Sequence, residues 1–249
     1  MSATPSAPFV LALRLRRPPD DYTADVPAFR GLERLELDPR VTFFVGENGS
    51  GKSTLIEALA VAAKLNAEGG GKLLRFATRS SHSRLHHALE LERSALPPLN
   101  AFFLRAESVF NLATAIEQGG YIGERENVFE RPLHEQSHGE SFLSLAANRF
   151  GRDGLYLLDE PEAALSVPGE LALLAVIARA ASAGAQFVVA THSPILLACR
   201  DARVYELNGS GVTTPDYDDL QAVSLTRGFL AAPERYLRAL DSDALEEDD

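Results

Sequence analysis

A nine-residue segment at positions 46–54 constrains the fold of this 249-residue chain more than any other feature. It reads Gly-Glu-Asn-Gly-Ser-Gly-Lys-Ser-Thr and satisfies the pattern G-x-x-x-x-G-K-[ST] at every fixed position. The apolar run 41–45 precedes it, and a segment with Leu55, Leu59 and Ala62 at helical spacing follows it. Since the pattern has a physical meaning only between a strand and a helix, this context predicts a strand, a glycine-rich loop and a helix in direct succession.

The glycines of this segment predict a turn that binds phosphate. Gly46, Gly49 and Gly51 let the backbone curl with its N–H groups pointing inward at the N-terminus of the following helix, an arrangement that favours anions. In such a loop Lys52 reaches the β- and γ-phosphates of a nucleotide, and the hydroxyl of Ser53 ligates Mg²⁺. The nucleotide-binding residues predicted here are Gly46, Glu47, Asn48, Gly49, Ser50, Gly51, Lys52, Ser53 and Thr54.

The composition bounds the class of protein. With 45% hydrophobic residues, a chain of this length can bury a full core as one large domain. No apolar run approaches the roughly 20 residues that cross a bilayer, and the N-terminus lacks the basic and apolar regions of a signal peptide. Cys199 is the only cysteine, which excludes an internal disulfide and a cysteine-rich zinc site; we expect it to be a small buried residue. The chain is therefore expected to be cytoplasmic, without a transmembrane segment.

The formal net charge of −11 is unevenly distributed. Six acids and no basic residue lie in 241–249, which is predicted to be an acidic disordered tail and leaves −5 for the rest of the chain. By contrast, residues 72–93 hold five lysines or arginines and three histidines. A solvated basic loop is the simpler interpretation of this segment, and weak contact with nucleic-acid phosphates is the alternative.

Short apolar runs recur along the chain and predict strands that are buried on both faces of a mostly parallel sheet. Residues 170–183 are rich in leucine and alanine and end at Gly184, which indicates a helix. Residues 106–150 favour helices and are interpreted as a helical insertion. A Gly-Ser-Gly turn predicts a hairpin between residues 204–207 and 212–214. This alternation predicts an α/β layer fold. The predicted strands are 9–15, 41–45, 101–104, 155–158 and 187–190.

Two acids and a histidine follow the later predicted strands. Asp159 and Glu160 come directly after the run 155–158, and His192 follows the run 187–190. At the carboxyl ends of parallel strands such side chains face a ligand crevice. Asp159 is therefore predicted to hold Mg²⁺ and Glu160 to act as a general base, against the simpler interpretation of the pair as an acidic strand exit. His192 is predicted to hydrogen-bond the γ-phosphate or the attacking water, because its ordinary pKa lies near neutrality.

The order of these motifs resembles that of the ATP-binding-cassette (ABC) ATPase superfamily, over residues 9 to about 207. The resemblance implies a P-loop NTPase fold of the ABC type, which is a mixed sheet flanked by helices with a helical subdomain at about 106–150. The segment Gln136-Ser-His-Gly-Glu is similar to the family's signature Leu-Ser-Gly-Gly-Gln and matches it at two of the five positions. The resemblance implies that this segment meets a γ-phosphate bound by a second subunit. The matching residues are Ser137 and Gly139; His138 replaces the first glycine and Glu140 replaces the glutamine.

Two further loops resemble those of the family with departures. Glu107 stands where the family's glutamine loop has its glutamine, and the resemblance implies that its carboxylate ligates Mg²⁺ or orients water. Residues 161–166 resemble the D-loop, with Ser166 in the place of an aspartate. Upstream of the phosphate loop, three side chains are candidates to contact adenine, although core packing or exposure to solvent is the simpler expectation for each. They are Tyr22, Phe29 and Arg30.

The spacing of the motifs separates the branches of the superfamily. Ser53 and Ser137 are 84 positions apart, which leaves no room for the long coiled coils of chromosome-structure (SMC) proteins. After His192 only 57 residues remain, which are too few for the nuclease domain of overcoming-lysogenization-type proteins. The chain is therefore similar to small stand-alone ATPases of the AAA/SMC/RecF-like group, with a single ABC-type domain over residues 1–240.

The resemblance implies a switch that hydrolyses ATP with Mg²⁺. ATP bound at the phosphate loop of one protomer is capped by the signature of a second, so that a homodimer closes; hydrolysis, with Lys52, Glu160 and His192 as catalytic residues, lets the two copies part. We expect an unidentified protein partner, with a role in DNA repair or defence. The alternative is the cytosolic ATP-binding subunit of an ABC transporter. A small-molecule kinase is a third interpretation, but it leaves the Asp-Glu pair and the signature unexplained.

Overall fold

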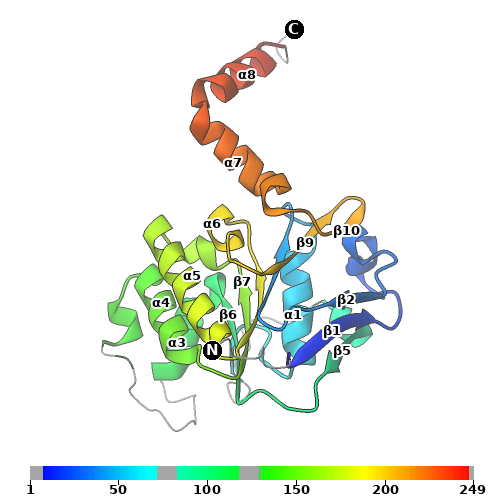
Figure 1. Ribbon diagram of the computed structural model, residues 1–249, viewed down its shortest axis with the longest axis vertical. Helices are drawn as coiled ribbons and strands as arrows, with labels where there is room; N and C mark the ends of the chain where they lie inside the picture. Colours follow the sequence, from blue (N-terminus) through cyan, green and yellow to red (C-terminus); the bar gives the residue numbers. More distant parts are fainter. Residues whose placement is uncertain (1–7, 72–82, 118–128, 130, 247–249) are drawn as a thin grey trace.

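The computed structural model of the chain has the α/β architecture that the sequence predicts (Figure 1). It describes residues 8–71, 83–117, 129 and 131–246, the last six of them by their backbone alone. Residues 72–82 of the predicted basic loop lie outside the described residues, and for most of the rest the prediction of a loop is wrong, because Leu85–Ala88 form a helix and Leu89–Arg93 form a strand. Within the described chain, no helix is both long enough and apolar enough to span a membrane.

A seven-stranded mixed sheet forms the centre of the molecule, in the order β10-β9-β3-β8-β7-β6-β4. The five inner strands are parallel, and a short antiparallel strand lies at each edge. Every residue of β3, β7 and β8 is buried, which is why continuous apolar runs form them. The predicted hairpin is confirmed as β9 and β10. The strands are β3 (Val41–Val45), β4 (Gly70–Gly71), β6 (Asn100–Arg105), β7 (Gly154–Asp159), β8 (Gln186–Ala190), β9 (Arg203–Asn208) and β10 (Gly211–Thr213).

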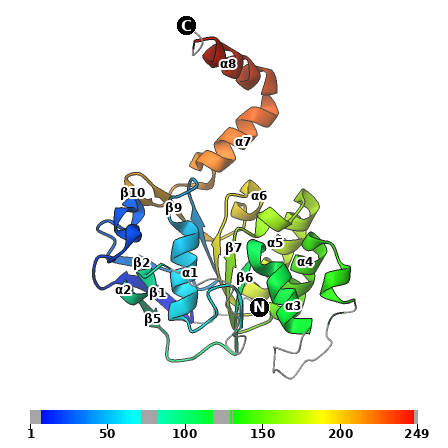
Figure 2. The ribbon, with the colours of Figure 1, turned by 180° about the vertical axis from the view of Figure 1, so that it is seen from behind.

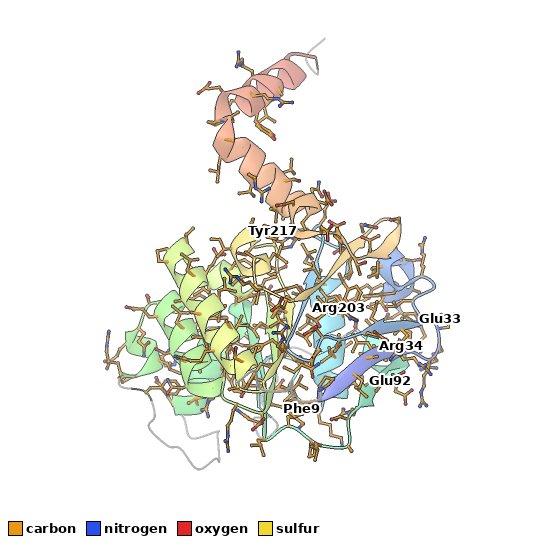
Figure 3. All side chains as sticks on the ribbon, viewed as in Figure 1. Phe9, Glu33, Arg34, Glu92, Arg203 and Tyr217 are labelled. Atoms are coloured by element: carbon orange, nitrogen blue, oxygen red, sulfur yellow. The ribbon has the colours of Figure 1, made fainter. Side chains whose placement is uncertain are left out.

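The first apolar run does not join this sheet, so its predicted place there is wrong. Strand β1 (Val10–Leu15) lies between β2 (Arg34–Glu36) and β5 (Leu89–Arg93) in a separate antiparallel sheet. Arg14 of β1 and Arg34 of β2 are exposed on one face of the small sheet, whereas Leu13 and Leu35 are buried on the other face. The outer face of the small sheet carries ion pairs between strands, such as Arg34 with Glu92 at 3.0 Å (Figure 3). Cross-strand charge pairs of this kind are typical of an antiparallel sheet with one face in solvent.

Helices cover both faces of the main sheet (Figures 1 and 2). Helix α1 (Lys52–Ala62) lies between the two sheets, whereas α3 (Val109–Glu117), α4 (His138–Arg149) and α5 (Val167–Ser182) pack on the opposite face. Because side chains alternate along a strand, the neighbours Phe43 and Phe44 of β3 belong to different hydrophobic clusters, Phe43 with the α3–α5 side and Phe44 with α1. Neighbouring residues of β3 are therefore buried on opposite faces of the sheet.

The helix predicted at 170–183 is confirmed as α5, and Gly184 follows it with a φ of 93°. All described elements between 106 and 150 are helical, as the sequence predicts. Cys199 is half-buried against the core. The shorter elements are α2 (Leu85–Ala88), α6 (Pro194–Leu197) and the 3₁₀ turns η1 (Tyr22–Asp25), η2 (Pro27–Phe29), η3 (Ala106–Ser108), η4 (Leu133–Glu135), η5 (Pro161–Ala164) and η6 (Tyr217–Asp219).

The C-terminal helices α7 (Gln221–Ala231) and α8 (Pro233–Glu246) extend away from the two sheets as an arm (Figures 1 and 2). The base of the arm is fixed by Tyr217, whose hydroxyl donates a hydrogen bond to the carbonyl of Pro194 at 2.9 Å (Figure 3). Helix α8 includes residues 241–246, so the prediction of a disordered tail is wrong for these six; residues 247–249 lie outside the described part. Leucines at helical spacing continue into this segment, which explains the helix.

One buried amide joins the two sheets. The side chain of Gln186 is fully buried at the start of β8. Its Oε1 accepts hydrogen bonds from the backbone N–H groups of Phe9 and Val10, at 3.0 and 2.9 Å. Its Nε2 donates to the carbonyls of Val10 and Asp38, at 2.8 and 2.9 Å. All four hydrogen-bonding positions of the amide are therefore used to hold the small sheet on the main sheet.

Replacing Gln186 by Leu should lower the free energy of unfolding by about 3–5 kcal/mol, because four buried backbone groups lose their partner at once. Urea unfolding followed by circular dichroism measures this loss. The matched control is Gln221→Leu at an exposed position, which should change the free energy by under about 0.5 kcal/mol. A loss at Gln186 no larger than that of the control would contradict the assignment.

Candidate active site

The carboxyl ends of three parallel strands bring the predicted site residues to one edge of the main sheet. The phosphate loop follows β3, the Asp-Glu pair ends β7, and the Thr-His-Ser segment follows β8. The strand register places Ala190 of β8 opposite both Phe44 of β3 and Asp159 of β7. Segments that are far apart in the sequence therefore leave the sheet at the same level, where a ligand crevice is expected.

Three glycines of the predicted phosphate loop have positive φ angles. Gly46, Gly49 and Gly51 have φ angles of 149°, 80° and 99°, a region that other residues rarely adopt. A Cβ at Gly46 would lie 2.2 Å from the carbonyl oxygen of Leu207, and one at Gly51 would lie 2.8 Å from the ring of Phe29. Gly46 and Gly51 therefore require glycine for both conformation and space, whereas Gly49 requires it for conformation alone. Phe29 is a buried packing residue, and Tyr22 and Arg30 are exposed.

The side chain of Lys52 hydrogen-bonds to the backbone of the predicted phosphate loop. The side chain is buried, and Nζ donates to the carbonyls of Gly46 and Glu47 at 2.9 and 3.0 Å. Burial lowers the pKa of Lys52, and the negative charges of Glu160 and Asp159 oppose this change. The ammonium group is thus placed over the loop before any phosphate arrives, as the predicted role requires.

Asp159 combines deep burial with an unused carboxylate oxygen. It is 4% exposed, and its Oδ2 lies 3.2 Å from Nε of Arg105. Burial raises its pKa to about 6, while the charge of Arg105 and a hydrogen bond from Ser53 act in the opposite direction. Its Oδ1 is buried without a hydrogen-bond partner. A free carboxylate oxygen beside the Ser53 hydroxyl fits the oxygen donors that Mg²⁺ prefers, so these residues suit the ion.

Arg105 is a site residue that the sequence did not reveal. It ends β6, where the register pairs it with Asp159, and its Nη1 lies 3.1 Å from Glu57 of α1. Glu107, which is predicted to ligate Mg²⁺, has a side chain that is 83% exposed and lies 3.7 Å from Arg105. In this structure Arg105 contacts Asp159 and Glu107 alike, so its guanidinium lies between the two acids. The role of Glu107 stays a prediction.

Glu160 and His192 face each other across a short gap. Glu160 has φ and ψ of 46° and 52°, a conformation that costs a residue other than glycine about 1–3 kcal/mol. Its Oε1 lies 3.6 Å from Nε2 of His192, and this nitrogen is buried without a hydrogen-bond partner. Burial and the charge of Lys52 lower the pKa of His192, so the imidazole is neutral at pH 7. A neutral imidazole can accept or donate a proton in the gap.

The predicted signature lies at the N-terminus of α4. Ser137 is the N-cap and forms a capping box with Glu140: the Ser137 N–H donates to Glu140 at 2.8 Å, and the Glu140 N–H donates to Ser137 Oγ at 3.3 Å. Among the described residues, no hydrogen bond or ion pair joins this segment to residues 46–54 of its own chain. A Cβ at Gly139 would lie 2.9 Å from the carbonyl of Ala164, so the signature packs closely on η5. His138 is exposed beside them.

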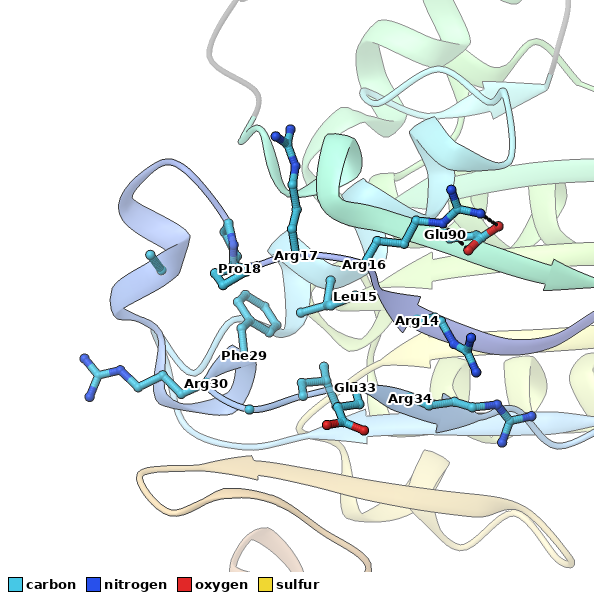
Figure 4. Close-up of a pocket in the computed structure, with 14 residues that line it drawn as sticks. Arg14, Leu15, Arg16, Arg17, Pro18, Phe29, Arg30, Glu33, Arg34 and Glu90 are labelled. Carbon is cyan, nitrogen blue, oxygen red and sulfur yellow. Dashed lines mark hydrogen bonds and ion pairs between the residues drawn. The ribbon is translucent and has the colours of Figure 1, made fainter.

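One cavity borders the phosphate loop, and another lies on the small sheet. One of about 510 Å³ has residues 46–50 on one side and the β9–β10 turn with Asp219 and Gln221 at the base of the arm on the other. A second, of about 1010 Å³, is lined by several arginines of β1, β2 and the loop between them (Figure 4). Acids pair with these arginines: Arg16 contacts Glu90, Arg14 and Arg34 contact Glu92, and Arg17 and Arg30 lie within 4.0 Å of aspartates. The second cavity is therefore close to electrically balanced.

Replacing Asp159 by Asn should raise the stability of the metal-free protein at neutral pH. The folded-state pKa of about 6 lies above the ordinary value of 3.8, so the folded protein binds more protons than the unfolded chain between pH 4 and 6. Wild-type stability is therefore lost as the pH rises through that window, and the loss is complete above it. The variant should exceed the wild type by about 1–3 kcal/mol at pH 7.5, with the difference shrinking toward pH 4. Urea titrations across this range measure it, with the exposed Asp216→Asn as control. A difference that does not vary with pH would contradict the assignment.

Comparisons with known proteins show what this chain is similar to. The AAA domain family matches residues 26–82. The chain is 30% identical over 184 residues to the cytochrome c biogenesis ATP-binding export protein CcmA of Rhodopseudomonas palustris, covering 71% of this chain and 90% of the relative. It is 31% identical over 202 residues to the zinc import ATP-binding protein ZnuC of Cereibacter sphaeroides, covering 79% and 76%. Among solved structures, the SMC head domain from Thermotoga maritima matches with a TM-score of 0.47 and 15% identity, covering 83% of this chain and 99% of that chain.

Proposed function

Because the chain belongs to the ATP-binding cassette (ABC) family of ATP-binding proteins, we propose that it is a switch whose two copies close over ATP as a homodimer. The chain is an ATPase that uses ATP with Mg²⁺. The observation that carries the proposal is the carboxyl edge of the sheet, where a preformed phosphate loop, a buried carboxylate with a free oxygen and a Glu–His pair meet.

The phosphate loop and its lysine bind the polyphosphate. Lys52 exchanges its bonds to the loop carbonyls for the β- and γ-phosphates. Ser53 and Asp159 would hold Mg²⁺, and the ion would neutralise phosphate charge there.

Glu160 and His192 act on the water that attacks the γ-phosphate. The carboxylate of Glu160 takes a proton from this water as general base. His192, neutral and with an unpartnered Nε2, orients the water or donates to the γ-phosphate. The gap of 3.6 Å between the two side chains leaves both free to turn toward a ligand.

A second copy completes the site in this proposal. The signature is exposed at the N-terminus of α4, where backbone N–H groups and the helix dipole favour an anion. In the free chain its Ser137 hydroxyl donates to Glu140 at 2.8 Å. A γ-phosphate from the partner copy would take over that donor, so closure depends on ATP. The arginine-lined cavity gives no support for nucleic-acid binding, and a role in DNA repair or defence rests on the resemblance alone.

A second candidate function is the ATP-binding subunit of a membrane transporter. The relatives named above are an export protein and an import protein, and this observation favours the candidate at least as strongly as the first. In that case the chain works at the cytoplasmic face of a membrane, beside a separate membrane-spanning protein. Affinity purification of the tagged chain from detergent-extracted membranes separates the two candidates. A membrane protein retained in fixed stoichiometry supports transport, and recovery of the chain alone supports the switch.

Replacing Glu160 by Gln should stop hydrolysis while ATP stays bound, so that the closed dimer accumulates. The amide keeps the size of the carboxylate but cannot take up a proton, and turnover should fall at least about a hundredfold. Size-exclusion chromatography with light scattering, in ATP and Mg²⁺, measures the dimer.

The control for this experiment is Lys52→Ala, which should lose ATP binding and remain a monomer under the same conditions. A Glu160→Gln protein that holds ATP yet elutes as a monomer would contradict the homodimer. It would leave the nucleotide site itself intact.

A further inference from the structure

We propose that Glu162 is a positioning residue for His192, which sets the separation between the histidine and Glu160. This inference rests on the proposed function, since it concerns the same hydrolytic site. Neither the phosphate loop nor the signature touches Glu162 through any hydrogen bond or ion pair described for the chain. Its part in the site follows from the contacts of its carboxylate.

Both carboxylate oxygens of Glu162 accept hydrogen bonds from the segment that carries His192. Oε2 accepts a hydrogen bond from the hydroxyl of Thr191 at 2.8 Å, and Oε1 accepts from the backbone N–H of His192. Thr191 Oγ1 in turn accepts from the N–H of Ser193 at 3.0 Å, so its proton points to Glu162. A carboxylate is the group that can accept at both oxygens while both neighbours donate.

The hydrogen bonds of Glu162 help to set the distance between the side chains of Glu160 and His192, because they join the two backbone segments that carry these side chains. Glu162 is two residues after Glu160 on the 3₁₀ turn η5, and the Glu160 N–H is bonded to the carbonyl of Ala190 at 2.9 Å. One hydrogen bond therefore joins residue 160 to residue 190, and the carboxylate of Glu162 joins residue 162 to residues 191 and 192. These hydrogen bonds hold the segments 160–162 and 190–192 side by side. The distance of 3.6 Å between Glu160 Oε1 and His192 Nε2 follows from this arrangement.

The neighbouring acid Glu170 gives a matched comparison. Its carboxylate accepts a hydrogen bond from the Ser193 hydroxyl, one residue beyond the histidine, and it makes no described contact with His192 itself. Ser193 Oγ also caps α6 by accepting from the N–H groups of Ile195 and Leu196, each at 3.1 Å. Loss of Glu170 loosens the same segment without releasing the histidine backbone.

The test compares Glu162→Gln with Glu170→Gln in steady-state ATPase assays and in histidine NMR spectra of the full chain. Glu162→Gln should lower kcat about 10- to 30-fold with KM for ATP changed less than about threefold, because positioning acts on the chemical step and not on ground-state binding. Glu170→Gln should lower kcat less than about threefold. The His192 ring resonance, assigned by its loss in His192→Gln, should shift in the first variant and not in the second.

A further variant keeps the test decisive if Glu162→Gln does not fold. Thr191→Val removes one of the two hydrogen bonds to Glu162 and should lower kcat by about two- to fivefold with an unchanged KM. Equal losses of kcat in the Glu162 and Glu170 variants, or an unmoved His192 resonance, would overturn the inference. In that event wild-type hydrolysis and its loss in Lys52→Ala would still uphold the proposed function, whereas a wild type as inactive as Lys52→Ala would overturn the function itself.

Discussion

The parallel pairing of β3, β8 and β7 is the constraint on which the site depends. These strands are buried along their whole length because both faces of the sheet are covered, by α1 on one side and by α3–α5 on the other. A slip of β8 by one residue would turn Gln186 to the other face of the sheet and break its four hydrogen bonds. The register that packing selects is the same register that aligns the ends of the strands, so the core and the site are fixed by one set of contacts.

The alignment of the strand ends brings several charged side chains together, and two of them, Lys52 and Asp159, are buried. Asp159, Glu160 and Glu162 approach two cations, Lys52 and Arg105, and an unpaired charge there would be costly. In the free chain the cations and hydrogen-bond donors are occupied by the protein itself, while Asp159 Oδ1 and His192 Nε2 have no partner. In the proposed function, a polyphosphate with its metal ion would replace the internal partners and satisfy the two unused atoms.

Much of this arrangement could be predicted from the sequence, since local patterns specify it. The phosphate loop, the Asp-Glu pair and His192 each follow a continuous apolar run, and parallel strands bring such ends together. What the sequence could not supply was pairing between distant side chains. In the sequence, Arg105 is only the polar end of a strand and Glu162 is only one acid after the Asp-Glu pair. The structure shows that the strand register places Arg105 opposite Asp159 and that Glu162 accepts a hydrogen bond from the His192 N–H. The displaced strand β1 has the same cause, because its pairing with β2 and β5 joins segments that are distant in the sequence.

The claim that two chains share one ATP site is tested most directly by mixing two inactive proteins. Lys52→Ala removes the phosphate loop's lysine, and Ser137→Arg blocks the signature; each protein alone should be inactive. In a mixed dimer, the intact phosphate loop of one chain meets the intact signature of the other. An equimolar mixture should therefore regain up to about a quarter of the wild-type ATPase rate, since half of the random encounters bring the two variants together and each such pair holds one complete site. A mixture no more active than its separate components, under conditions where the wild type turns over, would contradict the shared site.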